Sequence, residues 1–311
     1  MDILITGGAG FIGSHLCDLL LEKRNRVVVI DNLILGKIEN ISHLLDRGNF
    51  TFIEEDLLNR NMLQRIFNDE NFDMIYHLAA NSDIQKGSYD PTVDYNYTFN
   101  TTFNVLQCMR EFHVKKLFFA STSAIYGETY EQLSEDYGPL QPVSNYGAAK
   151  LASEAFISAF SSTYHIQTWI TRFPNVVGER FTHGVIYDFI HKLQSNPNAL
   201  TVLGNGEQVK PYLYVKDLIE GIQFVCENTN EWFNVYNLGS ESRTTVKEIA
   251  QMVVEEMELD ARIEYTGGDR GWAGDVPEFR YDLTKIHTLG WHATHSSNEA
   301  VRLAIRKALG K

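Results

Sequence analysis

Short runs of apolar and β-branched residues alternate along the first half of the chain with longer segments in which apolar residues recur every three or four positions. The short runs have the length of strands and lie at 3–6, 27–30, 51–54, 74–78, 116–121 and 168–172. The longer segments have the period of helices that bury one face, and they lie at 11–22, 62–68, 95–112 and 146–164. Strands that are apolar throughout are typical of a parallel sheet covered by helices on both faces. The pattern therefore predicts an α/β fold built on a doubly wound parallel sheet.

A glycine-rich turn joins the first predicted strand to the first predicted helix, and it consists of Gly7, Gly8, Ala9, Gly10, Phe11, Ile12 and Gly13. Such a turn lets the backbone approach a pyrophosphate at the positive end of a helix. The second strand ends at Asp31, whose carboxylate can bind a ribose and would repel a 2′-phosphate. Asp31 by itself would also fit a strand-end cap, but with the glycines in place it predicts a Rossmann-type site for NAD rather than NADP.

Two more strand ends can contribute to this NAD site. Asp56 and Leu57 follow the third strand, where they could flank the adenine. Small residues after the fourth strand would let the cofactor lie close to the backbone, and the segment is Leu78, Ala79 and Ala80. Each assignment has a structural alternative, because Asp56 could cap a helix and the alanines could be core residues.

The pattern becomes less regular after residue 173. Further strands are expected at 212–215 and 234–238, helices at 245–257 and 297–309, and glycine-rich loops at 204–206 and 266–271. We expect a first domain over residues 1–173, to which residues 212–240 return. A smaller, interleaved C-terminal α/β portion would then comprise residues 174–211 and 241–311.

Tyr146 and Lys150 are four residues apart at the start of a predicted helix, so their side chains share one face. A phenol ordinarily has a pKa near 10 and is a poor base at neutral pH. A nearby ammonium group, together with the positive nicotinamide ring of NAD, would lower that pKa. The hydroxyl of Thr122, at the end of the fifth strand, could share the proton. Tyr146 and Lys150 alone would also fit an ordinary exposed helix pair, so Thr122 strengthens the prediction of a catalytic group.

Taken together, these segments resemble the extended short-chain dehydrogenase/reductase family, and most of all the UDP-glucose 4-epimerase branch of its nucleotide-sugar epimerases and dehydratases. The segments that carry the resemblance are 7–13, 31–32, 77–80, 121–127 and 146–150. The resemblance implies an NAD-dependent enzyme in which Thr122, Tyr146 and Lys150 are catalytic and Ser123 contacts the substrate or replaces Thr122. It also implies that Asn32 contributes to the cofactor site.

The resemblance further implies a nucleotide-diphosphate sugar as substrate, bound by the C-terminal portion. The diphosphate would be held by Asn175, by Lys210 and by Arg270 in the glycine-rich segment 268–277. Lys210 stands where the family usually has arginine, and it can meet a phosphate only as a point charge. For Arg270 the alternative is a surface salt bridge. A homodimer formed through helices 95–112 and 149–164 is also implied.

The expected reaction is C4 epimerisation through a transient 4-keto sugar. The family's 4,6-dehydratases carry an Asp-Glu pair where this chain has Ser123 and Ala124, which cannot act as acid and base. One alternative is a dehydrogenase that releases the keto sugar. A less favoured alternative is a non-catalytic NAD-sensing protein, which would not need Thr122, Tyr146 and Lys150.

The formal net charge of −13 argues against binding to nucleic acid or to an anionic membrane surface. The three cysteines, at positions 17, 108 and 226, are far apart in the sequence, and neither a disulfide framework nor a metal site is expected. The first residues have the pattern of a strand entering a turn rather than that of an export signal. We therefore expect a cytoplasmic protein.

Overall fold

The computed structural model describes residues 1–271 and 276–311. Its contacts divide the chain into two compact units. Unit 1 comprises Met1–Ile125, Ser144–Arg172 and Ile222–Tyr236, and unit 2 comprises Tyr126–Val143, Phe173–Gly221 and Asn237–Lys311. This division differs from the sequence-based one because residues 126–143, 173, 212–221 and 237–240 belong to unit 2. The first of these segments is held there by pairing of β6 (Gln132–Leu133) with β15 (Arg280–Tyr281).

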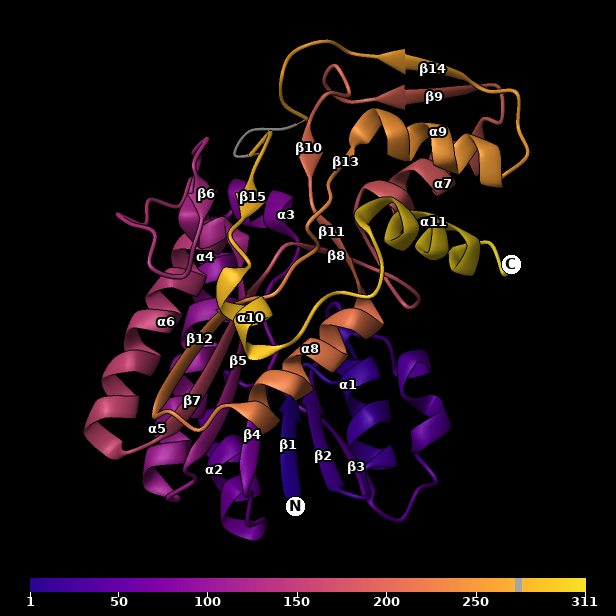
Figure 1. The fold of residues 1–311 in the computed structure, drawn as a ribbon. Helices are drawn as coiled ribbons and strands as arrows, with labels where there is room; N and C mark the ends of the chain where they lie inside the picture. Colours follow the sequence, from indigo (N-terminus) through magenta and orange to yellow (C-terminus); the bar gives the residue numbers. More distant parts are fainter. Residues whose placement is uncertain (272–275) are drawn as a thin grey trace. The chain divides into compact units, whose positions relative to one another are not determined.

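Unit 1 is built on a seven-stranded sheet with helices on both sides (Figure 1). The strands, in their order across the sheet, are β12 (Phe233–Asn237), β7 (Gln167–Phe173), β5 (Lys116–Thr122), β4 (Met74–His77), β1 (Asp2–Thr6), β2 (Arg26–Asp31) and β3 (Phe50–Glu54). The ladders from β3 to β5 are parallel, and Leu4 of β1 pairs with Val28 on one side and Ile75 on the other. The strand order reverses its direction between β1 and β4, which is the place where such sheets bind dinucleotides. The predicted doubly wound fold is confirmed.

The strands of unit 1 are buried on both faces, as their uninterrupted apolar sequences predict. Leu4, Val28 and Ile75 belong to one buried cluster with apolar residues of α2, α5 and α6. Ile3 and Ile5 are also fully buried. Because successive strand residues point to opposite faces, the second face of the sheet is covered as well.

The helices of unit 1 include the predicted ones, with nearly the predicted bounds, and two short ones at 84–89 and 91–94 that were not predicted. They are α1 (Phe11–Glu22), α2 (Arg60–Asp69), α3 (Ile84–Tyr89), α4 (Pro91–Asp94), a π-helical segment (Tyr95–Asn100), α5 (Thr101–Glu111) and α6 (Asn145–Tyr164). Short 3-10 turns lie at Ile38–Asn40, Ser42–Leu44 and Ser123–Tyr126. The N-terminus of α6 is fixed by Ser144, whose Oγ accepts a hydrogen bond of 3.1 Å from the Gly147 amide. The predicted helix over 95–112 therefore exists, but its first part is π-helical.

Unit 2 contains small two-stranded sheets and amphipathic helices. The additional strands are β8 (Asn175–Val177), β9 (Ala199–Val202), β10 (Val209–Lys210), β11 (Tyr212–Tyr214), β13 (Thr244–Thr245) and β14 (Arg262–Tyr265). The helices are α7 (Val185–Ser195), α8 (Val215–Asn228), α9 (Val246–Glu256), α10 (Thr284–Leu289) and α11 (Ser297–Ala308), of which α8 continues into unit 1. β8 pairs with β11 and β9 pairs with β14 in parallel, whereas β10 and β13 are antiparallel.

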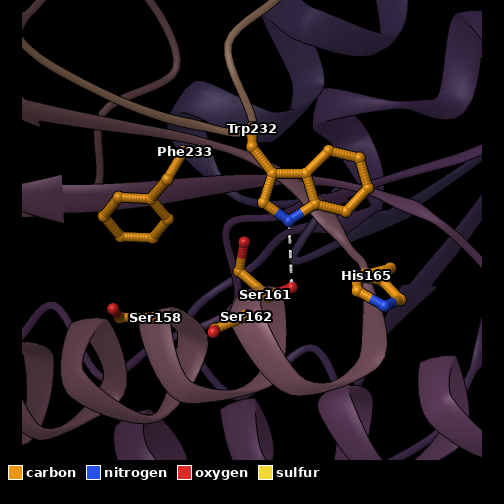
Figure 2. A pocket seen from close by; sticks show the side chains of 6 residues that line it. All are labelled: Ser158, Ser161, Ser162, His165, Trp232 and Phe233. Atoms are coloured by element: carbon orange, nitrogen blue, oxygen red, sulfur yellow. Dashed lines mark hydrogen bonds between the residues drawn. The ribbon is translucent and has the colours of Figure 1, made fainter.

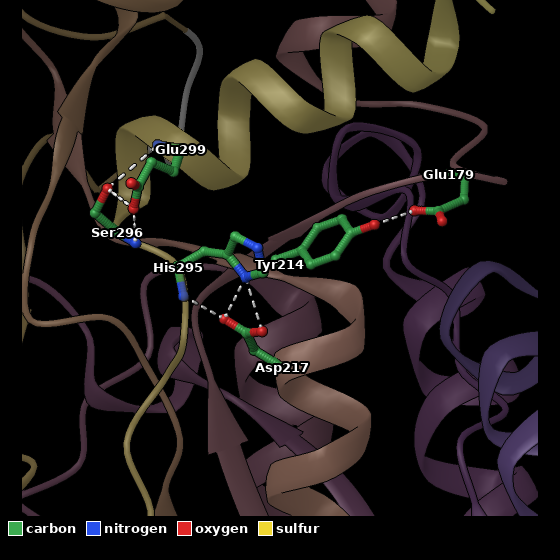
Figure 3. Close-up of polar contacts among 6 residues, drawn as sticks. All are labelled: Glu179, Tyr214, Asp217, His295, Ser296 and Glu299. Carbon is green, nitrogen blue, oxygen red and sulfur yellow. Dashed lines mark hydrogen bonds and ion pairs between the residues drawn. The ribbon is translucent and has the colours of Figure 1, made fainter. Parts of the chain in front are cut away.

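A buried carboxylate ties the segment before α11 to α8 (Figure 3). Asp217 is 3 % exposed, and it accepts a hydrogen bond of 2.9 Å from the His295 amide and lies 3.0 Å from the His295 Nδ1 atom. Ser296 and Glu299 then form a reciprocal capping box at the start of α11. Among the described residues, we find no helix that has both the length and the apolar character needed to cross a membrane.

Candidate active site

The glycine-rich turn has the geometry that a bound pyrophosphate requires. Gly7 has a φ of +73°, and a Cβ atom there would lie 2.8 Å from the amide nitrogen of Ala79. A Cβ atom on Gly13 would lie only 2.2 Å from the carbonyl oxygen of Gly7. Helix α1 begins with Gly10 as its N-cap, with no capping side chain and no acidic residue in its first turn. The positive end of α1 is therefore suited to a negatively charged group.

Asp31 lies at the end of β2, beside this turn. Its Oδ2 atom accepts a hydrogen bond of 3.0 Å from the Ala9 amide, and its Oδ1 atom accepts one of 2.9 Å from the Leu33 amide. Burial raises the pKa of the carboxyl group, whereas these backbone hydrogen bonds lower it. A carboxylate has about four acceptor positions, so Asp31 can still accept a hydrogen bond from a ribose hydroxyl. The glycine turn and Asp31 together fit an adenosine diphosphate group.

The other residues predicted for the cofactor lie at neighbouring strand ends. Asn32 donates a hydrogen bond of 3.2 Å to Asp56, which also accepts the Leu58 amide at 2.8 Å. The Leu57 side chain is 5 % exposed and belongs to the buried core cluster, so little of its surface is accessible to a ligand. The partly exposed segment after β4, which borders Gly7, consists of Leu78, Ala79 and Ala80.

The three predicted catalytic residues meet at the N-terminal turns of α6. Thr122 lies at the end of β5, near enough to Tyr146 for its hydroxyl to lower the pKa of the phenol. The Lys150 Nζ atom lies 5.9 Å from the centre of the Tyr146 ring and donates a hydrogen bond of 2.7 Å to the carbonyl oxygen of Ala120. The chain therefore presents a hydroxyl, a phenol and an ammonium group at the carboxyl end of β5.

The surroundings of Tyr146 and Lys150 shift the pKa values of both side chains. Tyr146 is partly exposed, but the protein packed around it raises its pKa, and the Asp94 carboxylate raises it further while Thr122 lowers it. Burial lowers the pKa of Lys150 to about 7, although the charge of Glu154 partly opposes this shift. The phenol therefore needs a positive charge beside it before it can act as a base.

Several residues behind these groups were not predicted from the sequence. Glu154 and Arg172 form a buried ion pair of 2.7 Å. His77 is fully buried between the hydroxyls of Thr6, at 2.6 Å, and Thr102, at 2.9 Å, and burial lowers its pKa to about 3. One signal was available for Glu154, because it continues the four-residue spacing of Tyr146 and Lys150 along α6.

The residues predicted to hold the substrate are divided between the units. Ser123 follows Thr122 in unit 1, whereas Asn175 begins β8, Lys210 ends β10 and Arg270 follows β14, all in unit 2. The Arg270 Nη2 atom lies 2.8 and 2.9 Å from the two carboxylate oxygens of Glu128, so the salt bridge considered as the alternative is present. Residues 272–275 of the segment that contains Arg270 lie outside the described residues.

Two other features are separate from this chemistry. An open pocket lies at the C-terminal end of α6 (Figure 2), and its lining residues are Ser158, Ser161, Ser162, His165, Trp232 and Phe233. It is at least 12 residues, or about 18 Å, along α6 from Tyr146.

In the described part of unit 2, Glu241, His287 and His292 place possible metal-ligand atoms close together. The two imidazole rings are stacked 4.1 Å apart at 23°, so their in-plane lone pairs do not converge on one point.

Comparisons with known proteins agree on one group of enzymes. The family described as GDP-mannose 4,6 dehydratase matches residues 4–304. A putative UDP-glucose 4-epimerase of Methanocaldococcus jannaschii is 30% identical over 309 residues, covering 97% of each chain. A crystal structure of UDP-galactose 4-epimerase has a TM-score of 0.88 and 35% identity, covering 100% of this chain and 99% of the other. The UDP-glucuronic acid 4-epimerase of Bacillus cereus, solved with UDP-glucuronic acid and NAD, has a TM-score of 0.89 and 30% identity, covering 99% and 100%.

Proposed function

The chain belongs to the extended short-chain dehydrogenase/reductase family, among its NAD-dependent nucleotide-sugar epimerases and dehydratases, and we propose that it is a C4 epimerase of a nucleotide-diphosphate sugar. The observation that carries the proposal is the meeting of Thr122, Tyr146 and Lys150 at the end of β5. The two residues that follow Thr122 point to epimerisation rather than dehydration. Ser123 and Ala124 supply neither a carboxylic acid nor a carboxylate to remove water from the sugar.

Unit 1 would bind NAD, with its pyrophosphate at the N-terminus of α1 and its adenine ribose on Asp31. When bound, NAD supplies a hydride acceptor that can also return the hydride to the sugar. Tyr146 would accept the proton of the C4 hydroxyl and later return it, because Lys150 favours the phenolate. Thr122 would polarise the same sugar oxygen, and Lys150 would also hold the nicotinamide ribose.

Unit 2 would anchor the nucleotide diphosphate so that the sugar can turn between the two hydride transfers. Asn175, Lys210 and Arg270 are the proposed anchors. Arg270 would exchange the Glu128 carboxylate for a phosphate, since both offer anionic oxygen atoms that accept hydrogen bonds from a guanidinium group. We further propose that the enzyme is a cytoplasmic homodimer that pairs through α5 and α6, where Phe156 is 41% exposed beside the Phe99 and Phe103 rings.

An isotope experiment tests the proposed reaction. A panel of UDP-, GDP-, CDP- and dTDP-sugars is first incubated with the protein, and products are identified by NMR. The sugar that reacts is then prepared with deuterium at C4. An epimerase should keep the deuterium on C4 of the product without accumulating reduced nicotinamide, which is followed by its absorbance.

The Tyr146→Phe variant is the matched control, since it keeps the fold and loses the proton-accepting oxygen. Stoichiometric formation of reduced nicotinamide with release of a keto sugar would instead establish the dehydrogenase alternative. Loss of the C4 deuterium with formation of a 4-keto-6-deoxy sugar would show a dehydratase. Cofactor binding without conversion of any sugar would favour the NAD-sensing alternative.

A further inference from the structure

A buried ion pair lies directly behind the proposed catalytic residues. Glu154 and Arg172 have side chains that are 7% and 8% exposed. The Glu154 Oε1 atom accepts hydrogen bonds from Arg172 Nε at 3.1 Å and from Ser121 Oγ at 2.5 Å. Its Oε2 atom accepts one of 2.7 Å from Arg172 Nη2. A carboxylate held by three such bonds is fixed in both position and charge.

This ion pair contacts the site through two elements. Glu154 is one helical turn beyond Lys150 on α6, so the two side chains lie on the same face. Ser121 precedes Thr122 on β5, and the carbonyl oxygen of Ala120 accepts the Lys150 ammonium group at 2.7 Å. The Glu154 carboxylate therefore lies next to Lys150 on α6 and, through Ser121, next to Thr122 on β5.

Stability alone gives a poor explanation for burying two charges at this place. Removing a carboxylate and a guanidinium from water is costly, and apolar residues of similar volume often stabilise a core equally well. A better explanation for the buried pair is the effect of the Glu154 charge on the pKa values of neighbouring groups. In a buried site that effect is only weakly screened by water and salt.

We propose that Glu154 is a positioning residue that keeps Lys150 in its ammonium form, and that Arg172 and Ser121 hold Glu154 ionised and in place for this purpose. The inference rests on the proposed function, because it acts through the lysine assigned there to the catalytic pair. The inference goes beyond the proposed function by naming Glu154 as the group that offsets the cost of burying the Lys150 charge.

The other groups around Lys150 cannot supply this charge. On β4, His77 is buried as a neutral ring, because burial and the Lys150 charge both lower its pKa. On β5, the contacts are the Phe119 ring, 4.6 Å from Nζ, and the Ala120 carbonyl oxygen. On α6 itself, Tyr146 is neutral in its resting form. The buried carboxyl of Asp94, on α4, acts on Tyr146. Glu154 is the group whose charge raises the pKa of Lys150.

The test compares variants that remove the charge of Glu154 with variants that keep it but disturb the geometry. Glu154→Gln removes the charge, whereas Glu154→Asp and Arg172→Lys keep both charges while breaking the bidentate contact. The full chain is labelled with [ε-13C]lysine, and the Lys150 signal is assigned by its loss in Lys150→Met. Its pKa is then measured by NMR without any nucleotide sugar, so the result does not depend on the proposed reaction.

We expect Glu154→Gln to lower the pKa of Lys150 by about one unit. Glu154→Asp and Arg172→Lys should lower it by less, because they displace the carboxylate but keep its charge. Because the pKa of Lys150 is about 7, turnover at pH 7 should fall about fivefold in Glu154→Gln, and the alkaline limb of the pH profile should move by about one unit to lower pH. Failure of the proposed function would leave no turnover to measure, but the NMR shift would remain.

If Glu154→Gln does not fold because Arg172 is left without its partner carboxylate, the double variant Glu154→Gln with Arg172→Met removes both buried charges. A smaller downward shift of the Lys150 pKa is expected there, because the opposing positive charge of Arg172 is removed as well. An unchanged or raised Lys150 pKa in either variant would overturn the inference. So would an equal downward shift in Arg172→Lys, since geometry rather than charge would then be responsible.

Discussion

Replacement of Lys150 by methionine should make the protein more stable while it removes the proposed activity. Lys150 is 2% exposed, and burial lowers its pKa from the ordinary 10.5 to about 7. A lysine whose folded pKa lies below its unfolded pKa disfavours folding at low pH, because the unfolded chain binds the proton more tightly. The cost is complete below pH 7, decreases as the pH rises between 7 and 10.5, and vanishes above that range.

The size of the effect follows from the two pKa values. At pH 7 they correspond to a cost of about 4 kcal/mol. The variant also loses the hydrogen bond from Lys150 to the Ala120 carbonyl oxygen, worth about 1 kcal/mol. Methionine has a similar length and no charge to bury. The Lys150→Met variant should therefore be more stable than the wild type by roughly 3 kcal/mol at pH 7.

The measurement is urea denaturation of both proteins, without nucleotides, followed by circular dichroism. The free-energy difference between them should shrink by about 2 kcal/mol between pH 7.5 and pH 9, because the folded wild type loses its lysine proton in that range. Lys116, an exposed residue on the same strand as Ala120, provides the control. Lys116→Met should give a difference near zero that does not change with pH. A Lys150→Met protein that is less stable than the wild type, or a difference that is constant with pH, would refute the reasoning.

Three further predictions concern the proposed sites. Tyr146→Phe should lower turnover by at least about a thousandfold and leave the NAD dissociation constant nearly unchanged in calorimetric titration; near-normal turnover would remove Tyr146 from the mechanism. Asp31→Ala should weaken NAD binding and improve the relative binding of NADP, by loss of a hydrogen-bond acceptor and of a repulsive charge; unchanged affinities for both would place Asp31 away from the ribose. Sedimentation should show that the wild type is a dimer and that Phe156→Glu dissociates it. The control Phe233→Glu, at another exposed aromatic position of unit 1, should leave the dimer intact. A wild-type monomer would contradict the proposed assembly.

The large sheet could be predicted from the sequence because each of its main strands carries its own signal. Residues 27–30 are apolar without interruption, and β2 includes all four of them. Helix α1 has the predicted bounds, since the glycine-rich turn determines where it begins. The short strands of unit 2 could not be predicted in this way. β10 has only two residues, and its existence depends on pairing with β13, which lies more than thirty residues later.

The candidate site was predictable where spacing alone brings groups together. Tyr146 and Lys150 share a face of α6 because they are four residues apart, and the end of β5 brings Thr122 to them. The contact between Glu154 and Arg172 depends instead on the packing of α6 against β7, which no local pattern encodes. Thr98, in the π-helical segment before α5, is fully buried, and its hydroxyl accepts a hydrogen bond of 3.1 Å from the Asn81 amide. The sequence places Thr98 in a predicted helix, but no local pattern predicts its contact with Asn81.

The interleaving of the two units limits how the chain can be assembled and recombined. The chain passes from one unit to the other after residues 125, 143, 172, 221 and 236. During synthesis, unit 1 therefore lacks its last segment until Tyr236 has left the ribosome, by which time the first two of the three segments of unit 2 have also been made. A single genetic crossover between related enzymes, placed anywhere from residue 126 to residue 236, would mix both units at once. Transfer of unit 2 alone would need three separate segments, so new substrate preferences are reached more readily through point changes than through exchange of a whole domain.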